Sequence, residues 1–153
     1  MVRRERRVAI TACRDALNGY QRGRCFHCGG PLSLAPVDAA LADVDHLFPR
    51  TLVRSGPLPR SIDGVWNLVL ACRDCNRGRG GKRALAPGSD AVARLHRRNE
   101  YLIQSHHPLR ETLMAQTGAA GAERRDLLRR FGLLAREQLV HEWRAPEPRG
   151  PLP

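Results

Sequence analysis

Aromatic residues are scarce in this chain, and long hydrophobic runs are missing. Phe, Trp and Tyr make up only 5% of the 153 residues, although apolar residues as a whole reach 42%. No apolar stretch approaches the roughly 20 residues that a membrane-spanning helix needs. The N-terminus is basic, but no hydrophobic signal segment follows it. The composition therefore favours one domain of modest core, with small helical additions and no membrane partner.

Acidic residues are too few to balance the basic ones. The chain has 26 Lys and Arg against 15 Asp and Glu, a formal net charge of +11, and nearly all of the positive charge is arginine. A planar guanidinium suits phosphate better than a lysine ammonium does. This balance favours a polyanionic partner, above all nucleic acid, although a biased genome could also produce an arginine-rich chain.

Cysteines are few, but their spacing is informative. Four of the five form two C-x-x-C pairs, Cys25 with Cys28 and Cys72 with Cys75, while Cys13 stands alone. Such pairs are typical of a tetrahedral zinc site with four thiolates, and not of a disulfide framework. We therefore expect a structural Zn²⁺ ion and a reducing, cytoplasmic location. A thioredoxin-type redox motif is the alternative for either pair alone, but the βαβ pattern it requires is absent.

Hydrophobic periodicity predicts a mixed core preceded by a helix. Apolar residues at three- and four-residue spacing indicate a helix within residues 1–23. Residues 24–86 hold both cysteine pairs, with short apolar stretches at 39–48 and 65–71 that suit strands. The sequence therefore predicts an α+β core at 24–86.

A helical extension and a proline-rich tail follow this core. Helical spacing returns after Pro87, first behind a capping Ser89 and again over about residues 121–143. We therefore predict a helical extension at 87–145. Residues 146–153 include four prolines, and we expect this tail to be disordered.

Polar residues between the cysteine pairs have the chemistry of a one-metal phosphodiesterase. Hydrolysis of a phosphodiester needs a base for water and a cation on the phosphoryl oxygens. The neutral imidazole of His46 can act as this base near neutral pH. A hard cation such as Mg²⁺ prefers oxygen ligands, which Asp45 and Asn76 can supply. Each residue alone is more often structural, so the joint pattern carries the argument.

The order of these residues resembles that of the HNH endonucleases, whose ββα-metal motif is framed in many members by two C-x-x-C knuckles. The first knuckle of the family resembles Cys25-Phe-His-Cys28. Its first motif resembles Val44-Asp45-His46-Leu-Phe-Pro49, and its second resembles Asn67-Leu-Val-Leu-Ala-Cys72-Arg-Asp-Cys75-Asn76. The similarity covers about residues 25–83.

This resemblance implies a small ββα-metal HNH core, stapled by zinc, with helical additions at both ends. It implies that His46 is the general base and that Asp45 and Asn76 hold a catalytic Mg²⁺ or Mn²⁺ ion. Asn67 would orient the His46 loop through backbone hydrogen bonds. Water would attack one strand and leave a 5′-phosphate and a 3′-hydroxyl. Arg79 stands where the family often has lysine, which keeps a phosphate-binding cation.

Basic residues near these motifs can contact phosphate. The candidates are Arg50, Arg77, Arg79, Lys82 and Arg83. Contacts of this kind predict salt-sensitive binding to DNA, duplex or branched, with RNA not excluded and little sequence choice. A solvated loop without a partner is the alternative for the cluster after Asn76.

Two other functions compete with a metal-dependent DNA endonuclease. The first is a catalytically silent, zinc-stapled nucleic-acid-binding module, which would not need Asp45, His46, Asn67 and Asn76 together. The second is a nuclease subunit of a larger defence complex, in which the C-terminal helices form a homodimer or dock onto another protein.

Overall fold

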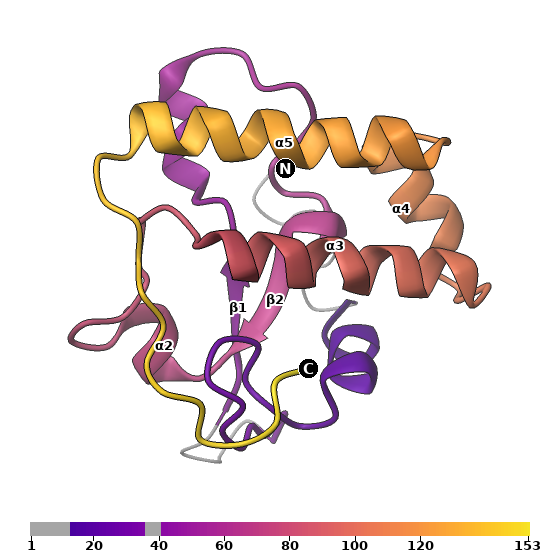
Figure 1. Cartoon of the computed structure of the whole chain (residues 1–153). Helices are drawn as coiled ribbons and strands as arrows, with labels where there is room; N and C mark the ends of the chain where they lie inside the picture. Colours follow the sequence, from indigo (N-terminus) through magenta and orange to yellow (C-terminus); the bar gives the residue numbers. More distant parts are fainter. Residues whose placement is uncertain (1–12, 36–40) are drawn as a thin grey trace, which may run out of the picture. The chain divides into compact units, whose positions relative to one another are not determined.

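The computed structural model describes residues 13–35 and 41–153, and it is α+β, with several helices and one two-stranded sheet (Figure 1). The chain divides into two compact units. Unit 1 comprises the described parts of Met1–Asp45, Leu68–Arg83 and Arg144–Pro153, and unit 2 comprises His46–Asn67 and Ala84–Trp143. The predicted core at 24–86 contributes to both. Residues 1–12 of the predicted N-terminal helix, and 39–40 of the first predicted strand, lie outside the described residues.

Unit 1 is organised around the sheet of β1 (Asp43–His46) and β2 (Leu68–Ala71), of which the last residue of β1 belongs to unit 2. All four residues of β2 are buried, as expected for a continuous apolar strand. A helix at residues 13–21 is tied to this strand by Gln21. The Gln21 side-chain amide donates to the Leu70 carbonyl at 2.8 Å and accepts from the Leu70 N–H at 2.9 Å.

The second cysteine pair follows β2 directly. A short helix, α2 (Arg73–Arg77), begins after Cys72 and contains Cys75. The extended backbone of Cys72 marks the transition from strand to helix. This strand–turn–helix order fixes both thiols next to the sheet.

Unit 2 contains three helices, α3 (Ser89–Gln104), α4 (Arg110–Thr117) and α5 (Gly121–Gln138), and two 3-10 segments, η1 (Arg50–Ser55) and η2 (Val65–Asn67). The helices α3 and α5 pack against each other, and α4 links their ends (Figure 1). The sequence predicts helices over the regions of α3 and α5 but not α4. None of the helices in the described part of the chain has the length and apolarity to cross a lipid bilayer.

The few aromatic residues are concentrated in the core of unit 2. The rings of Trp66 and Phe131 have centroids 5.0 Å apart, and those of Phe48 and Phe131 are 5.4 Å apart. All three side chains are fully buried. Complete burial of such a side chain contributes about 1.5–3 kcal/mol. One cluster therefore joins α5 to the segment after His46 and to η2.

Buried polar side chains of α3 satisfy the backbone of η2. Arg98 is 1% exposed and donates to the carbonyls of Val65 and Trp66 at 3.2 and 3.1 Å. Asn99 donates to the same Trp66 carbonyl at 3.0 Å. Since an unpaired buried carbonyl is costly, these bonds fix the irregular segment that leads into Asn67.

The proline-rich tail belongs to unit 1 and contacts its first cysteine pair. The Arg149 N–H donates to the Cys28 carbonyl at 2.7 Å. Gly29 has a φ of +70°, and a Cβ atom there would collide with the backbone of Gly150. Proline favours an extended backbone without internal hydrogen bonds, so this segment is held by neighbouring residues rather than by its own secondary structure.

Candidate metal centre and catalytic residues

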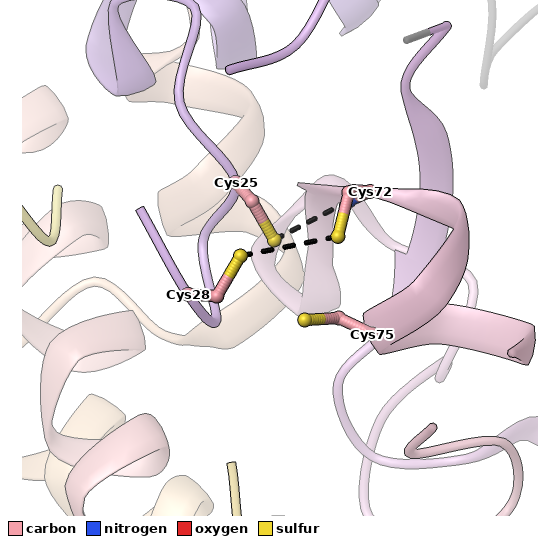
Figure 2. A group of neighbouring side chains, drawn as sticks. All are labelled: Cys25, Cys28, Cys72 and Cys75. Carbon is pink, nitrogen blue, oxygen red and sulfur yellow. Dashed lines mark hydrogen bonds between the residues drawn. The ribbon is translucent and has the colours of Figure 1, made fainter. Parts of the chain in front are cut away.

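The four paired cysteines gather at one point in unit 1. Their Sγ atoms all lie within 4.8 Å of one another, and they point toward a common centre (Figure 2). The Sγ atoms of Cys28 and Cys72 are 3.9 Å apart. Tetrahedral Zn²⁺ with Zn–S bonds of about 2.3 Å requires sulfurs about 3.8 Å apart. The cluster can therefore hold a structural metal ion such as zinc.

A tight turn presents the first two thiols. The Cys25 N–H donates to the Gly30 carbonyl at 2.7 Å, and the Gly29 N–H donates to the Cys25 carbonyl at 2.9 Å. The φ of +70° at Gly29 suits glycine, because a side chain there would be strained. The spacing of the pair thus reflects the geometry of this turn.

Backbone amides surround the sulfurs and favour their negative form. The N–H groups of His27 and Cys72 lie 3.4 and 3.3 Å from Cys25 Sγ, and the N–H of Gly30 lies 3.4 Å from Cys28 Sγ. The Cys75 thiol donates to Cys25, which lowers the pKa of Cys25 to about 4 and raises the pKa of Cys75. A metal ion takes the place of such thiol protons when it binds.

Asp45 is buried in unit 1 at the centre of an ion-pair network. Its Oδ2 lies 3.0 Å from His27 Nε2, and its Oδ1 lies 3.3 Å from Lys82 Nζ. The exposed fractions of the three side chains are 6% for Asp45, 1% for His27 and 0% for Lys82. Burial lowers the pKa of Lys82, while the charge of Asp45 opposes this shift.

This network differs from the roles predicted for its members. Asp45 is predicted as a ligand of a catalytic cation, and Lys82 is predicted as a phosphate contact. In the structure the Lys82 ammonium is fully buried, so it does not reach phosphate from this position. The physical reason is that a carboxylate on the buried side of β1 needs a counter-charge.

Asn76 lies beside Asp43, also in unit 1. The Asn76 side-chain amide donates to Asp43 Oδ2 at 3.1 Å, and Arg77 Nε donates to the same oxygen at 2.8 Å. The Asp43 side chain is 19% exposed. The Asn76 N–H donates to the Cys72 carbonyl, so the second knuckle fixes its backbone. Asp43 thus pairs with a predicted ligand and with a predicted phosphate contact.

His46 is held by a carboxylate in unit 2. Its Nε2 lies 2.8 Å from Asp63 Oδ1, and Arg50 Nε donates to the same oxygen at 3.1 Å. The exposed fractions are 14% for the His46 side chain and 30% for Asp63. Burial raises the pKa of Asp63, but the hydrogen bonds from His46 and Arg50 outweigh it, so the pKa lies below its usual value. Asp63 is therefore ionised at neutral pH.

Asn67 fixes the loop that follows His46. Its side chain is fully buried. Its Oδ1 accepts from the Phe48 N–H at 2.8 Å, and its Nδ2 donates to the carbonyls of Phe48 and Ile62 at 3.0 Å. The resemblance implies backbone bonds of this kind. Since Ile62 precedes Asp63, the same side chain also sets the position of the carboxylate that holds His46.

Sequence reasoning misses Asp63 and the partners of Asp45. Asp63 lies 17 residues after His46, in a stretch that indicates only a loop. A lone Asp before Gly64 carries no periodic signal. The remaining predicted phosphate contacts, Arg50, Arg77, Arg79 and Arg83, are exposed.

Within residues 13–35 and 41–153, the four cysteines form the only group of three or more His, Cys, Asp or Glu side chains placed to hold a metal ion. The cation site predicted from Asp45 and Asn76 would have only one carboxylate and one amide, so it is not a group of three or more such side chains. Comparisons with family models, curated protein sequences and solved structures find no match to this chain.

Proposed function

We propose that this chain is a metal-dependent endonuclease of HNH type, which hydrolyses phosphodiester bonds in DNA with His46 as the general base. The observation that carries the proposal is the pairing of His46 with Asp63 at 2.8 Å. A carboxylate holds an imidazole in one orientation and stabilises the imidazolium that forms when the ring takes a proton. Arg50 donates to the same carboxylate oxygen at 3.1 Å.

The pairing defines which nitrogen takes the proton. When Nε2–H of His46 donates to Asp63, the lone pair of the neutral ring lies on Nδ1. Nδ1 is then the atom that accepts a proton from the attacking water. Asn67 supports this step from a distance, because it fixes the backbone on both sides of the pair, at Phe48 and at Ile62.

The proposed catalytic cation, Mg²⁺ or Mn²⁺, would stabilise charge on the phosphoryl oxygens. Of the two ligands implied by the resemblance, Asn76 offers an amide oxygen, but Asp45 does not fit as arranged. Its oxygens contact His27 and Lys82, and an ammonium at 3.3 Å repels a second cation. Asp43 is the more exposed carboxylate beside Asn76.

A second candidate function is favoured by the same buried network. If Asp45 serves only to pair with Lys82 and His27, the chain would be a zinc-stapled nucleic-acid-binding module without activity. The exposed arginines, Arg77, Arg79 and Arg83, suit both functions. The two proposals differ only in cleavage.

The deciding experiment is cleavage of supercoiled plasmid by the zinc-loaded protein, with Mg²⁺ or Mn²⁺ added and then chelated. We expect nicking that depends on the added cation and is lost in His46→Ala. Asp43→Asn and Asp45→Asn are compared in the same assay, and loss of cleavage in a variant that stays folded identifies the carboxylate that the cation needs. Salt-sensitive DNA binding without any cleavage would sink the nuclease and leave the binding module.

A further inference from the structure

A groove lies between α3 and α5 in unit 2, and the proposed chemistry does not use it. It encloses about 310 Å³. Its floor is apolar and includes Phe48, Val92, Leu128 and Ala135. Pockets of this size and lining are typical of sites that bind the apolar body of a ligand.

The rim of the groove is cationic. Arg125, Arg129 and Arg136 line it from α5, and His96 lines it from α3. The three arginines are exposed, and Arg129 also pairs with Asp126 at 2.7 Å. Their fork of N–H donors suits phosphate groups. The ligand must therefore combine an apolar body with negative charge beside it.

Polar groups at one end of the groove can recognise the edge of a planar ligand. Ser89, at the start of α3, offers a hydroxyl, and Glu142 offers a carboxylate. Glu142 lies close to the backbone of Gly88, so the two groups share this end. A hydroxyl and a carboxylate together can bind the donors and acceptors on the edge of a base.

We propose that this groove binds single-stranded nucleic acid, with one unpaired base on the apolar floor and the neighbouring phosphates on the arginines. A stacked duplex does not present a base in this way, whereas a single strand does. The first twelve residues of the chain do not suit the groove as its occupant. They carry four arginines and one glutamate, and the arginines of the rim would repel this positive charge. The inference rests on the proposed function for the choice of nucleic acid as the ligand. It adds that this nucleic acid is single-stranded.

Gly132 provides the sharpest test, because it lines the groove and a Cβ atom there meets nothing within 4 Å. Gly132→Phe should fill the groove without strain. The matched control is Gly19→Phe, which adds the same ring at an exposed helical position in unit 1 where a Cβ also meets nothing. Binding is measured by fluorescence anisotropy with labelled oligothymidylate and with a duplex of equal length, without added divalent cation.

We expect Gly132→Phe to weaken binding to the single strand about tenfold or more, with duplex binding and Gly19→Phe unchanged. Arg136→Gln should lower the slope of log K against log salt by about 0.7 for the single strand, as loss of one phosphate contact predicts. Arg130→Gln, on the same helix but outside this groove, removes the same charge as a control. Its slope for the single strand should change less.

Unchanged single-strand binding in Gly132→Phe would overturn the inference, and so would an equal loss for the duplex. Binding of polyglutamate that is tighter than that of oligothymidylate and lost in Gly132→Phe would assign the groove to an acidic protein partner instead. Because no divalent cation is added, failure of plasmid cleavage removes only the proposed nuclease, whereas failure of these binding differences removes only the groove.

Discussion

The imidazole of His46 and the carboxylate of Asp63 are joined by a hydrogen bond of 2.8 Å, although the two residues are 17 positions apart in the chain. The Asn67 side chain bonds to the backbone of Phe48, near His46, and of Ile62, next to Asp63. One buried side chain therefore fixes the backbone beside both members of the pair. A histidine so oriented is preorganised for proton transfer.

Asp63→Asn should slow cleavage without unfolding the protein. The amide does not stabilise the imidazolium, so we expect a loss of about 100-fold in the rate of plasmid nicking. DNA binding and the free energy of unfolding should stay close to those of the parent. Asp15→Asn, an exposed change in unit 1, serves as the control. Equal activity in the parent and Asp63→Asn would remove Asp63 from the site.

Lys82→Met should destabilise unit 1 strongly, because it leaves Asp45 as a buried charge beside His27. Removal of one partner of a buried pair costs about 3–5 kcal/mol. Asp45→Asn combined with Lys82→Met should cost less than the sum of the single changes, since neither charge then remains alone. Urea unfolding of the four proteins measures this coupling. Strict additivity would mean that the 3.3 Å contact contributes nothing.

Cys72→Ser should release zinc and unfold unit 1. Three thiolates leave the tetrahedral site incomplete, and the two knuckles then lose their link. Zinc content and amide hydrogen exchange provide the readouts. Cys13→Ser is the matched control, because Cys13 is buried in the helix at residues 13–21 and lies outside the cluster. A folded, zinc-free Cys72→Ser protein would contradict a structural metal site.

The pair of Glu100 and Arg124 predicts a pH dependence for unit 2. Arg124 donates to both carboxylate oxygens, at 2.6 and 3.0 Å, and this lowers the pKa of Glu100. A lowered pKa contributes stability above the ordinary value of about 4.3, and this stability is lost as the pH falls through the folded-state pKa.

Glu100→Gln should therefore reduce the free energy of unfolding by about 1 kcal/mol at pH 7. The difference from the parent should shrink as the pH falls below the ordinary glutamate pKa, and it should close below the lowered folded-state pKa, where Glu100 is neutral in both states. Urea unfolding between pH 2.5 and 7 measures the difference. A gap that persists at the acidic end would mean that packing, not charge, is responsible.

Local patterns in the sequence predict the local parts of this structure. The cysteine cluster follows from C-x-x-C spacing, since a tight turn and the start of α2 each bring two thiols to one side. The regions of α3 and α5 follow from apolar spacing, because a helix repeats its buried face every three or four residues. Both signals need only a few neighbouring residues.

The pairing of charges is not local, and sequence reasoning does not find it. Lys82 stands among exposed arginines and glycines, and nothing in that run distinguishes the one ammonium that the fold buries against Asp45. Asp63 stands in a loop whose path is set by Asn67. The tail is a further case, since the Arg149 N–H donates to the carbonyl of Cys28, which is distant in the sequence.

The burial of Lys82 has a consequence for covalent labelling. It is the only lysine in the chain, and its side chain is fully inaccessible in the folded protein. Amine-reactive dyes and enzymes that acetylate or ubiquitinate lysine therefore meet no lysine amine on the folded surface. Labelling of Lys82 would instead report that unit 1 has opened.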